Sequence, residues 1–404
     1  MKITRFWPST VHLWLCAFRP FFLLASAHAI VAMAWWLGSL AGLLPLPALP
    51  GGTIVWHAHE MIFGFASAAV AGFLLTAIVK FTGTPAVDRK TVQLLLGLWL
   101  GGRLFYLLAE WLGVLPAAFC DLAFLLLLIA CIAGPLWRQP GRRHLAFFNA
   151  LCALAAVHAG FYLTLWRGGD AMPWLLLAVG LMMLLIVIAL SRISMRLVND
   201  VLEHQGGITA PYLARPPRRN LAMFTIAAFS VSEFLLPANT VSGWLALAAA
   251  AAIFNLLNDW HVGRALWQRW VLIPYLGYWA MALGYAVIGV GLLSGSNWRS
   301  AGHHLLLVGA MALLVLIVMS AAGRVHSGHG LDHRRWLPAA AALLFGAGLL
   351  RAAASLPAIM TAYTPLLYAA ATPWLLAWSI YLIYSWTALS GPRPDGRQGC
   401  DETA

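Results

Sequence analysis

Residues 56–61, which read Trp-His-Ala-His-Glu-Met, place two imidazoles, a carboxylate and a thioether in one short segment. Imidazole nitrogens bind copper, iron and zinc, and a thioether suits Cu(I). A carboxylate beside a ligating histidine commonly orients its ring. His57 and His59 lie two residues apart, which is about 200° around an α-helix. They therefore serve different partners unless the segment departs from a regular helix, and we take His57, His59 and Glu60 as candidates for a metal or cofactor site.

Further ionisable side chains lie in apolar stretches far along the chain. His158 lies inside one such stretch, and His303 and His304 open another. The carboxylates of Asp121 and Glu233 are similarly surrounded by apolar residues. Ionisable groups in such surroundings are functional candidates by default. A structural hydrogen bond to a neighbouring helix is the alternative for each of them.

A second group of histidines borders arginine-rich connections and comprises His12, His261, His326, His329 and His333. His326 and His329 are three residues apart, and His329 and His333 four, so a helix would place them on one face. Two intervening glycines oppose an unbroken helix there. Solvation or helix capping is the alternative role for histidines in basic loops.

Arg103 lies inside an apolar stretch and therefore needs an anion nearby. This anion could be a carboxylate such as Glu60 or Glu233, or a propionate of haem. The resulting ion pair could be structural or functional. The five cysteines form no Cys-x-x-Cys or Cys-x-x-Cys-His motif. This excludes covalent c-type haem and disfavours a thiolate cluster.

The composition shows what kind of element must position these groups. Of 404 residues, 62% are apolar and only 9% are Asp, Glu, Lys or Arg, against about 25% charged residues in a typical soluble protein. The mean hydropathy is +0.82. So few charges exclude a soluble globular enzyme. A Walker loop, a Rossmann glycine fingerprint and a nucleophile elbow are all missing from the sequence, so ATP-driven and nicotinamide-dependent chemistry are unsupported.

Twelve segments are apolar over the roughly 20 residues that a membrane-spanning helix needs. Their approximate ranges are 19–43, 55–80, 92–112, 115–137, 145–166, 172–190, 220–236, 240–257, 271–293, 303–322, 337–355 and 364–389. A transmembrane barrel would instead show alternating segments of about ten residues. The sequence therefore predicts an all-α integral membrane protein with about 12 transmembrane helices and no soluble domain.

The basic residues give an orientation. With a cytoplasmic N-terminus, all but four of the 25 Lys and Arg residues fall on the cytoplasmic side, as the positive-inside rule requires. Both termini are then cytoplasmic. We expect a cytoplasmic N-terminal segment (1–18), a first six-helix half (19–190), a basic cytoplasmic loop (191–219), a second six-helix half (220–389) and a disordered cytoplasmic tail (390–404).

The net charge of +12 follows from this topology and needs no nucleic-acid partner. Attraction to the anionic headgroups of the lipid bilayer is its consequence. The first apolar segment is long enough to span and lacks a convincing cleavage site, so we interpret it as a retained signal anchor. In a bacterium, the expected location is the inner (cytoplasmic) membrane, with multiple passes.

At residues 56–65 (Trp-His-Ala-His-Glu-Met-Ile-Phe-Gly-Phe) and 71–77 (Ala-Gly-Phe-Leu-Leu-Thr-Ala), the sequence resembles the NnrS family. Further similar segments are 18–23, 149–158, 192–194, Trp260-His261, His304 and 324–329. The resemblance covers residues 18 to about 335. Two positions depart from the family pattern: a Gly-His-Thr-Gly-Arg ending reads Gly-His-Gly-Leu-Asp at residues 328–332, and Tyr275 stands where a histidine is common.

The resemblance implies a polytopic inner-membrane protein that contains haem and copper and is associated with denitrification and tolerance of nitric oxide. The haem would be non-covalent and of b type. Carried over residue by residue, the metal-ligand candidates are His57, His59, His158, His261, His304 and His329. The candidates for binding the cofactor, by contact with any part of it, are His57, His59, His158, His304, Arg103 and Glu60.

Three functions remain open at this point. The first is a haem and copper protein acting on nitric oxide or iron-nitrosyl species, with electrons from quinol or another donor. The second is a twelve-helix secondary transporter, which the six-plus-six division would suit. The third is a non-catalytic sensor of nitric oxide or a haem-handling protein. Whether the protein is an enzyme is left open.

Overall fold

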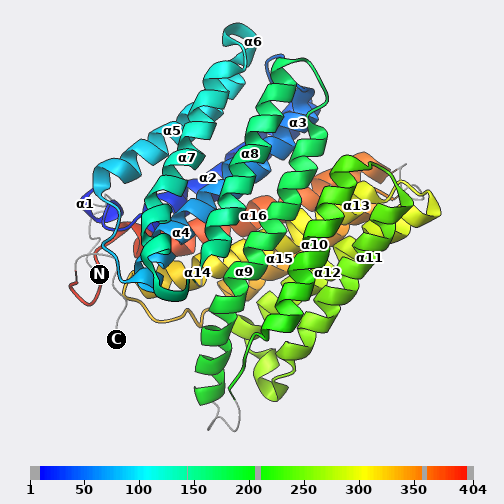
Figure 1. Ribbon diagram of the computed structural model, residues 1–404. Helices are drawn as coiled ribbons and strands as arrows, with labels where there is room; N and C mark the ends of the chain where they lie inside the picture. Colours follow the sequence, from blue (N-terminus) through cyan, green and yellow to red (C-terminus); the bar gives the residue numbers. More distant parts are fainter. Residues whose placement is uncertain (1–9, 143, 205–210, 357–361, 398–404) are drawn as a thin grey trace. The chain divides into compact units, whose positions relative to one another are not determined.

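The structure is a computed structural model that describes residues 10–142, 144–204, 211–356 and 362–397, and every regular element in these ranges is a helix (Figure 1). The all-α fold class is therefore confirmed. The uninterrupted long helices are α2 (Phe18–Leu40), α5 (Arg89–Leu107), α7 (Leu115–Arg138), α8 (Leu145–Trp166), α9 (Met172–His204), α10 (Pro216–Leu235), α11 (Thr240–Leu257), α12 (Arg269–Ser294), α15 (Trp336–Ala354) and α16 (Tyr363–Ser390).

Two further helical segments contain a π-helical part in their middle. The first is α3 (Gly52–His59), η1 (Glu60–Ala66) and α4 (Ser67–Thr82), and the second is α13 (Arg299–His304), η5 (Leu305–Ala312) and α14 (Leu313–His326). Each π-helical part directly follows a pair of histidines. Such π segments are rare and frequently occur at functional sites. The short elements are α1 (Thr10–Leu13), α6 (Ala109–Leu112), η2 (Pro140–Arg142), η3 (Asn258–Trp260) and η4 (Gly263–Trp267).

Ten helical segments of the described chain are long and apolar enough to cross a membrane, which makes this a multi-pass membrane protein. The two expected spans outside this set are α5 and α10, which are 19 and 20 residues long. Both are less apolar than the other long helices, because α5 carries Arg89, Lys90 and Arg103 and α10 carries two arginines and Glu233. The expected count of twelve stays a prediction.

Helix boundaries follow local sequence signals. The Asp88 side chain precedes α5 and accepts hydrogen bonds from the backbone N–H groups of Lys90 (2.9 Å) and Thr91 (3.1 Å), as an N-terminal cap does. Gly83 ends α4 with a φ of 65°, a conformation that glycine adopts without strain. Helix α9 continues to His204, well into the range 191–219 that the sequence suggests as a loop. Arg196 and Asp200, four residues apart in that extension, pair at 3.9 Å.

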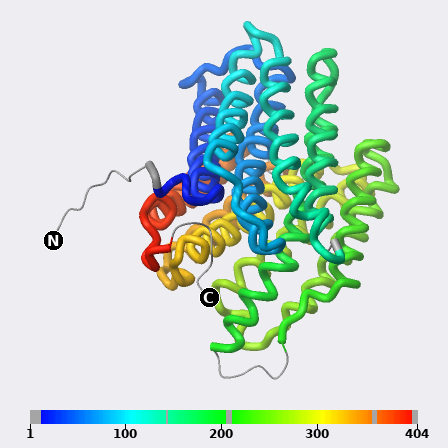
Figure 2. The backbone as a smooth tube through the Cα atoms, turned by 60° about the vertical axis from the view of Figure 1, so that its left-hand side comes forward, coloured from blue at the N-terminus to red at the C-terminus, as the bar shows by residue number. Residues whose placement is uncertain are grey.

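The chain forms two compact units. The first comprises the described parts of 1–175, 318–337 and 378–404, and the second comprises those of 176–317 and 338–377. In the first unit α7 packs against α4, α5 and α8, while α2 packs against α4 and η1, and these helices lie side by side (Figure 2). In the second unit α11 packs against α10 and α12, and α12 also contacts α13 and η5.

Candidate metal centre in the first unit

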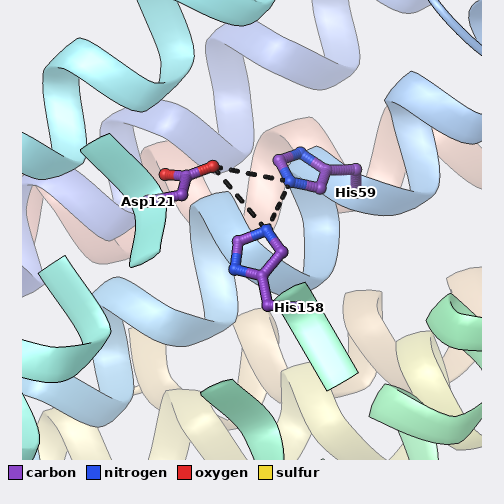
Figure 3. A group of neighbouring side chains, drawn as sticks. All are labelled: His59, Asp121 and His158. Atoms are coloured by element: carbon purple, nitrogen blue, oxygen red, sulfur yellow. Dashed lines mark hydrogen bonds and ion pairs between the residues drawn. The ribbon is translucent and has the colours of Figure 1, made fainter. Parts of the chain in front are cut away.

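Three side chains from three helical segments converge inside the first unit (Figure 3). His59 ends α3, Asp121 lies in α7 and His158 lies in α8. The Nε2 atoms of His59 and His158 are 2.9 Å apart, and the Oδ2 atom of Asp121 lies 3.6 Å from the first and 3.7 Å from the second. All three residues are at most 2% exposed. We call them the His–His–Asp trio.

The trio has the dimensions of a metal site. Metal–imidazole bonds of about 2.0–2.1 Å in a tetrahedral site place neighbouring ligand atoms roughly 3.3 Å apart. The three separations in the trio, 2.9, 3.6 and 3.7 Å, bracket that value. Within the described residues it is the one group of three or more His, Cys, Asp or Glu side chains that meets this geometry. The donor atoms therefore fit a small transition-metal ion.

Glu60 fixes the proton position on His59. Its Oε1 atom lies 3.0 Å from Nδ1 of His59, so Nδ1–H donates and the Nε2 lone pair faces the trio. His158 presents its own Nε2 to the same point, and no partner for its buried Nδ1 occurs in the described chain. Two ring nitrogens 2.9 Å apart must share either a proton or a cation. This arrangement orients His59 as a carboxylate orients a zinc-bound histidine.

Arg103 holds both carboxylates of the centre. Its Nη2 atom donates to Oδ1 and Oδ2 of Asp121 at 2.7 and 2.6 Å, and its Nε atom lies 3.0 Å from Oε2 of Glu60. The anion that Arg103 needs is thus supplied by Asp121 and Glu60 together. With neutral histidines, two buried negative charges face one positive charge, so one further cation would balance the site. The Nε2 atom of His28 also lies 3.0 Å from Oε2 of Glu60.

The π-helical segment η1 provides backbone acceptors for this network. The carbonyl of Phe63 accepts a hydrogen bond from Arg103 Nη1 at 2.7 Å, and the carbonyl of Gly64 accepts one from Trp99 Nε1 at 3.0 Å. The hydroxyl of Ser67 also donates to the Phe63 carbonyl. Side chains that enter the backbone ladder of a helix are a recognised cause of its distortion. The departure from a regular helix just after His59 is therefore tied to Arg103 and Trp99.

Aromatic rings enclose the trio. Phe63 stacks on His158 with ring centroids 3.5 Å apart, and Phe161 stacks on His59 at 4.9 Å. The hydroxyl of Tyr162 donates to Asp121 Oδ2 at 2.5 Å and lies 3.4 Å from His59 Nε2. Such packing locks the ring orientations and excludes water. It also leaves Tyr162 as a hydroxyl in direct contact with both ligand types.

The trio does not fit a haem between its two imidazoles. Two axial bonds of about 2 Å each would separate the Nε2 atoms by about 4 Å. The observed separation is 2.9 Å, and Phe63 covers one face of His158. A macrocycle at this point would have to displace that ring and part the two histidines.

The other candidate ligands lie elsewhere. His57 stacks on Trp36 with centroids 4.0 Å apart, as expected for a residue on a different helix face from His59. His304, in the second unit, has its Nδ1 atom 2.7 Å from the Ser300 carbonyl. His261 is exposed after η3, and His329 follows α14. None of these four joins a group of three ligands within the described chain.

The second unit contains a buried carboxylate of its own, Glu233. Glu233 lies 3.0 Å from Arg299 Nη2 and 3.4 Å from His303 Nε2. His303 Nδ1 also contacts the Arg299 carbonyl at 2.8 Å. Glu233 thus forms an ion pair with Arg299 and, where His303 is protonated, a second one.

Tyr162 and Trp99 belong to the site but were not among the candidates that the sequence indicated. Tyr162 follows His158 by four residues and so shares its helix face, which was an available signal. Trp99 precedes Arg103 by four residues on α5 in the same way. This four-residue spacing is the only signal in the sequence that separates these two from the many other aromatic residues of the chain.

The helices and the trio define a class: a polytopic helical membrane protein with a buried histidine–carboxylate centre. The family model described as NnrS protein matches residues 12–393. The chain therefore belongs to the NnrS family, and the resemblance found in its histidine motif is confirmed. No curated protein matches the chain.

Proposed function

We propose that this protein is a metal-dependent membrane protein of the nitric oxide response, in which His59, His158 and Asp121 hold a transition-metal ion that acts on nitric oxide or an iron-nitrosyl species. One observation carries the proposal: three ligand atoms from three helical segments meet within 3.7 Å in a buried site. Membership in the NnrS family supports the link to nitric oxide. A role in denitrification and a location in a bacterial inner membrane belong to the same proposal.

Copper is the metal we propose, because the family resemblance implies it and imidazole ligands suit it. Iron is a second candidate, favoured by the donor set itself. Two histidines and one carboxylate with open positions are the ligands of non-haem Fe(II) sites. Either ion would supply an open coordination position for a diatomic ligand when bound.

The surrounding residues have definable tasks in this proposal. Glu60 holds the Nδ1–H tautomer of His59, and Arg103 holds Asp121 and Glu60 in place. Tyr162, which donates to Asp121 and lies 3.4 Å from His59 Nε2, is the hydroxyl best placed to hold a proton near the trio. Phe63 and Phe161 exclude water, which strengthens every electrostatic interaction inside the site. Quinol or another reduced donor would supply electrons.

A non-covalent b-type haem would need an imidazole outside the trio. His57 in the first unit and His304 in the second remain candidates for that ligand. An absorption spectrum of the purified protein, with a haem band lost in His57→Ala or His304→Ala, would identify it.

Loss of nitric oxide measured with an electrode tests the proposed function. Proteoliposomes containing the protein and a quinol should consume nitric oxide, and His158→Ala should reduce the rate by more than the roughly 10–100-fold seen for mutations around metal ligands. His261→Ala, an exposed histidine, serves as the matched control. Equal rates for the wild type and His158→Ala would contradict catalysis at the trio and favour a sensor. Gradient-driven solute uptake without bound metal would favour a transporter.

A further inference from the structure

A fourth oxygen or nitrogen atom meets the ligand atoms of the trio. Tyr162 is buried in α8, four residues after His158 and therefore on the same helix face. Its hydroxyl donates to Asp121 Oδ2 at 2.5 Å and lies 3.4 Å from His59 Nε2. Asp121 Oδ2 is also the oxygen that faces both imidazoles. The phenol oxygen thus lies beside the point where a metal ion would bind.

The distances around Tyr162 Oη are those of a fourth ligand. Neighbouring ligand atoms of a tetrahedral site are roughly 3.3 Å apart, and the 3.4 Å separation from His59 Nε2 matches this value. The 2.5 Å separation from Asp121 Oδ2 is shorter, because the phenol proton joins the two oxygens in a charge-assisted hydrogen bond. A metal ion in place of that proton would move the two oxygens apart and keep both as ligands.

Tyr106 is a second tyrosine beside the trio, but its hydroxyl is directed elsewhere. Its ring centroid lies 4.8 Å from that of His59, which is closer than the 5.7 Å of Tyr162. The Tyr106 hydroxyl donates to the backbone carbonyl of Pro50 at 3.1 Å. Of these two tyrosines, Tyr162 is the one that contacts the ligand atoms through its oxygen.

The charge of the centre favours a phenolate ligand when the bound ion is divalent. With neutral imidazoles, the carboxylates of Glu60 and Asp121 and the guanidinium of Arg103 leave one negative charge. A monovalent ion balances this charge by itself. A divalent ion leaves one positive charge in excess, which is unfavourable in a buried site. The phenolate of Tyr162 would balance it.

We propose that Tyr162 is a redox-linked fourth ligand of a copper ion held by the trio, with its phenolate bound to Cu(II) and its neutral phenol hydrogen-bonded to Asp121 beside Cu(I). This role rests on the proposed function. Soft ligands suit Cu(I), so the anionic oxygen of Tyr162 is the ligand expected to leave on reduction. When quinol or another donor gives one electron to the ion, the Oη–Cu bond breaks and Oη takes up one proton from the solvent. The reduced ion then keeps three protein ligands and an open position for a diatomic molecule.

Visible absorption and resonance Raman spectra of the purified full-length protein, loaded with Cu(II) in detergent, test this ligand. The wild type should show a charge-transfer band with phenolate vibrations that shift when the protein is made with ring-deuterated tyrosine. Tyr162→Phe should lose the band and these vibrations while it retains copper. Tyr106→Phe is the matched control, because it removes a neighbouring hydroxyl that contacts Pro50, and it should retain both signals.

Carbon monoxide tests the open position of the reduced ion. After reduction with ascorbate, the wild type and Tyr162→Phe should bind carbon monoxide with equal affinity, as measured by infrared spectroscopy. Tighter binding to Tyr162→Phe would show that the tyrosine still occupies this position in the reduced protein, and would overturn the redox-linked exchange.

The copper content separates a failure of this role from a failure of the proposed function. Copper-loaded wild type without vibrations that depend on deuterated tyrosine overturns the ligand role of Tyr162, as does an unchanged band in Tyr162→Phe. Either result leaves the copper at the trio. A wild type that binds no copper contradicts the proposed function as well. If Tyr162→Phe does not fold or binds no copper, Tyr106→Phe decides: a retained deuterium shift supports Tyr162 as the ligand, and a lost shift overturns it.

Discussion

At the scale of the residue, Arg103 connects the two carboxylates that the centre requires. Its guanidinium contacts both Asp121 and Glu60, and the residue is only 7% exposed. Charges in such surroundings are stable only when paired and hydrogen-bonded. Removing the arginine would leave two carboxylates in an apolar interior. The charge of Arg103 is therefore a condition for the geometry of the trio.

Arg103→Gln should lower the free energy of unfolding by about 3–5 kcal/mol, the usual loss when one partner of a buried ion pair is removed. Thermal unfolding in detergent measures the change. Arg196→Gln, which breaks the exposed pair with Asp200, should cost at most about 1 kcal/mol. Similar losses for the two variants would contradict the role assigned to Arg103.

Asp332, which lies outside the membrane-spanning segments, makes the free energy of unfolding depend on pH. The Arg334 side chain, the Trp336 indole N–H and Arg324 hold the pKa of this carboxyl well below its usual value. A carboxyl whose pKa is lowered by folding stabilises the folded state fully above its unfolded pKa of about 3.9. This stabilisation is lost as the pH falls from that value through the pKa of the folded state. Asp332→Asn should therefore lower the melting temperature at pH 7, and the difference from the wild type should shrink below about pH 4. A difference that stays constant from pH 7 to pH 3 would rule out this linkage.

At the scale of the element, close helix packing sets the position of Asp121. Helix α5 meets α7 through Gly102, where an added Cβ would collide with Asp121 Oδ1. Gly64 in η1 has a comparable relation to His28 Nε2. Small residues at helix contacts in membranes allow such approaches. The glycines thus position the charged groups as much as the hydrogen bonds do.

Gly102→Ala should displace the Asp121 carboxylate from Arg103 and reduce the metal content of the purified protein. Gly97→Ala is the matched control on the same helix, because nothing lies within 4 Å of its added Cβ. The control should retain its metal and gain up to about 1 kcal/mol, as Gly→Ala in a helix interior does. Metal analysis and melting curves of both variants decide the point, and full metal retention in Gly102→Ala would contradict it.

At the scale of the whole molecule, topology follows from the apolar segments and the placement of arginines. In the expected orientation, the α7–α8 connection lies in the cytoplasm and the α12–α13 connection lies on the opposite side. Green fluorescent protein, which folds in the bacterial cytoplasm, reports the difference when fused after residue 141 or residue 296. Fluorescence is expected from the first fusion and not from the second, and the reverse pattern would refute the proposed orientation.

The helical membrane fold and part of the site were predictable from the sequence. The period and the length of the apolar segments predicted the long helices. The motif at residues 56–61 indicated His59 and Glu60 as site residues. The choice of His158 over His304 as the partner of His59 was not predictable, because it depends on which helices pack together. The same applies to Asp121, which lies 62 residues beyond His59 in the sequence. The helical extension of α9 was also missed, because polar residues interrupt the apolar pattern there.

Metal content of the purified protein, with electron paramagnetic resonance of the bound ion, tests the central claim most directly. We predict that the ion bound to the wild type shows couplings to imidazole nitrogen, and that His59→Ala, His158→Ala and Asp121→Ala each lose this ion. The exposed His261→Ala control should keep it. Equal metal content and an identical spectrum in the wild type and the three trio variants would contradict a metal centre at His59, Asp121 and His158.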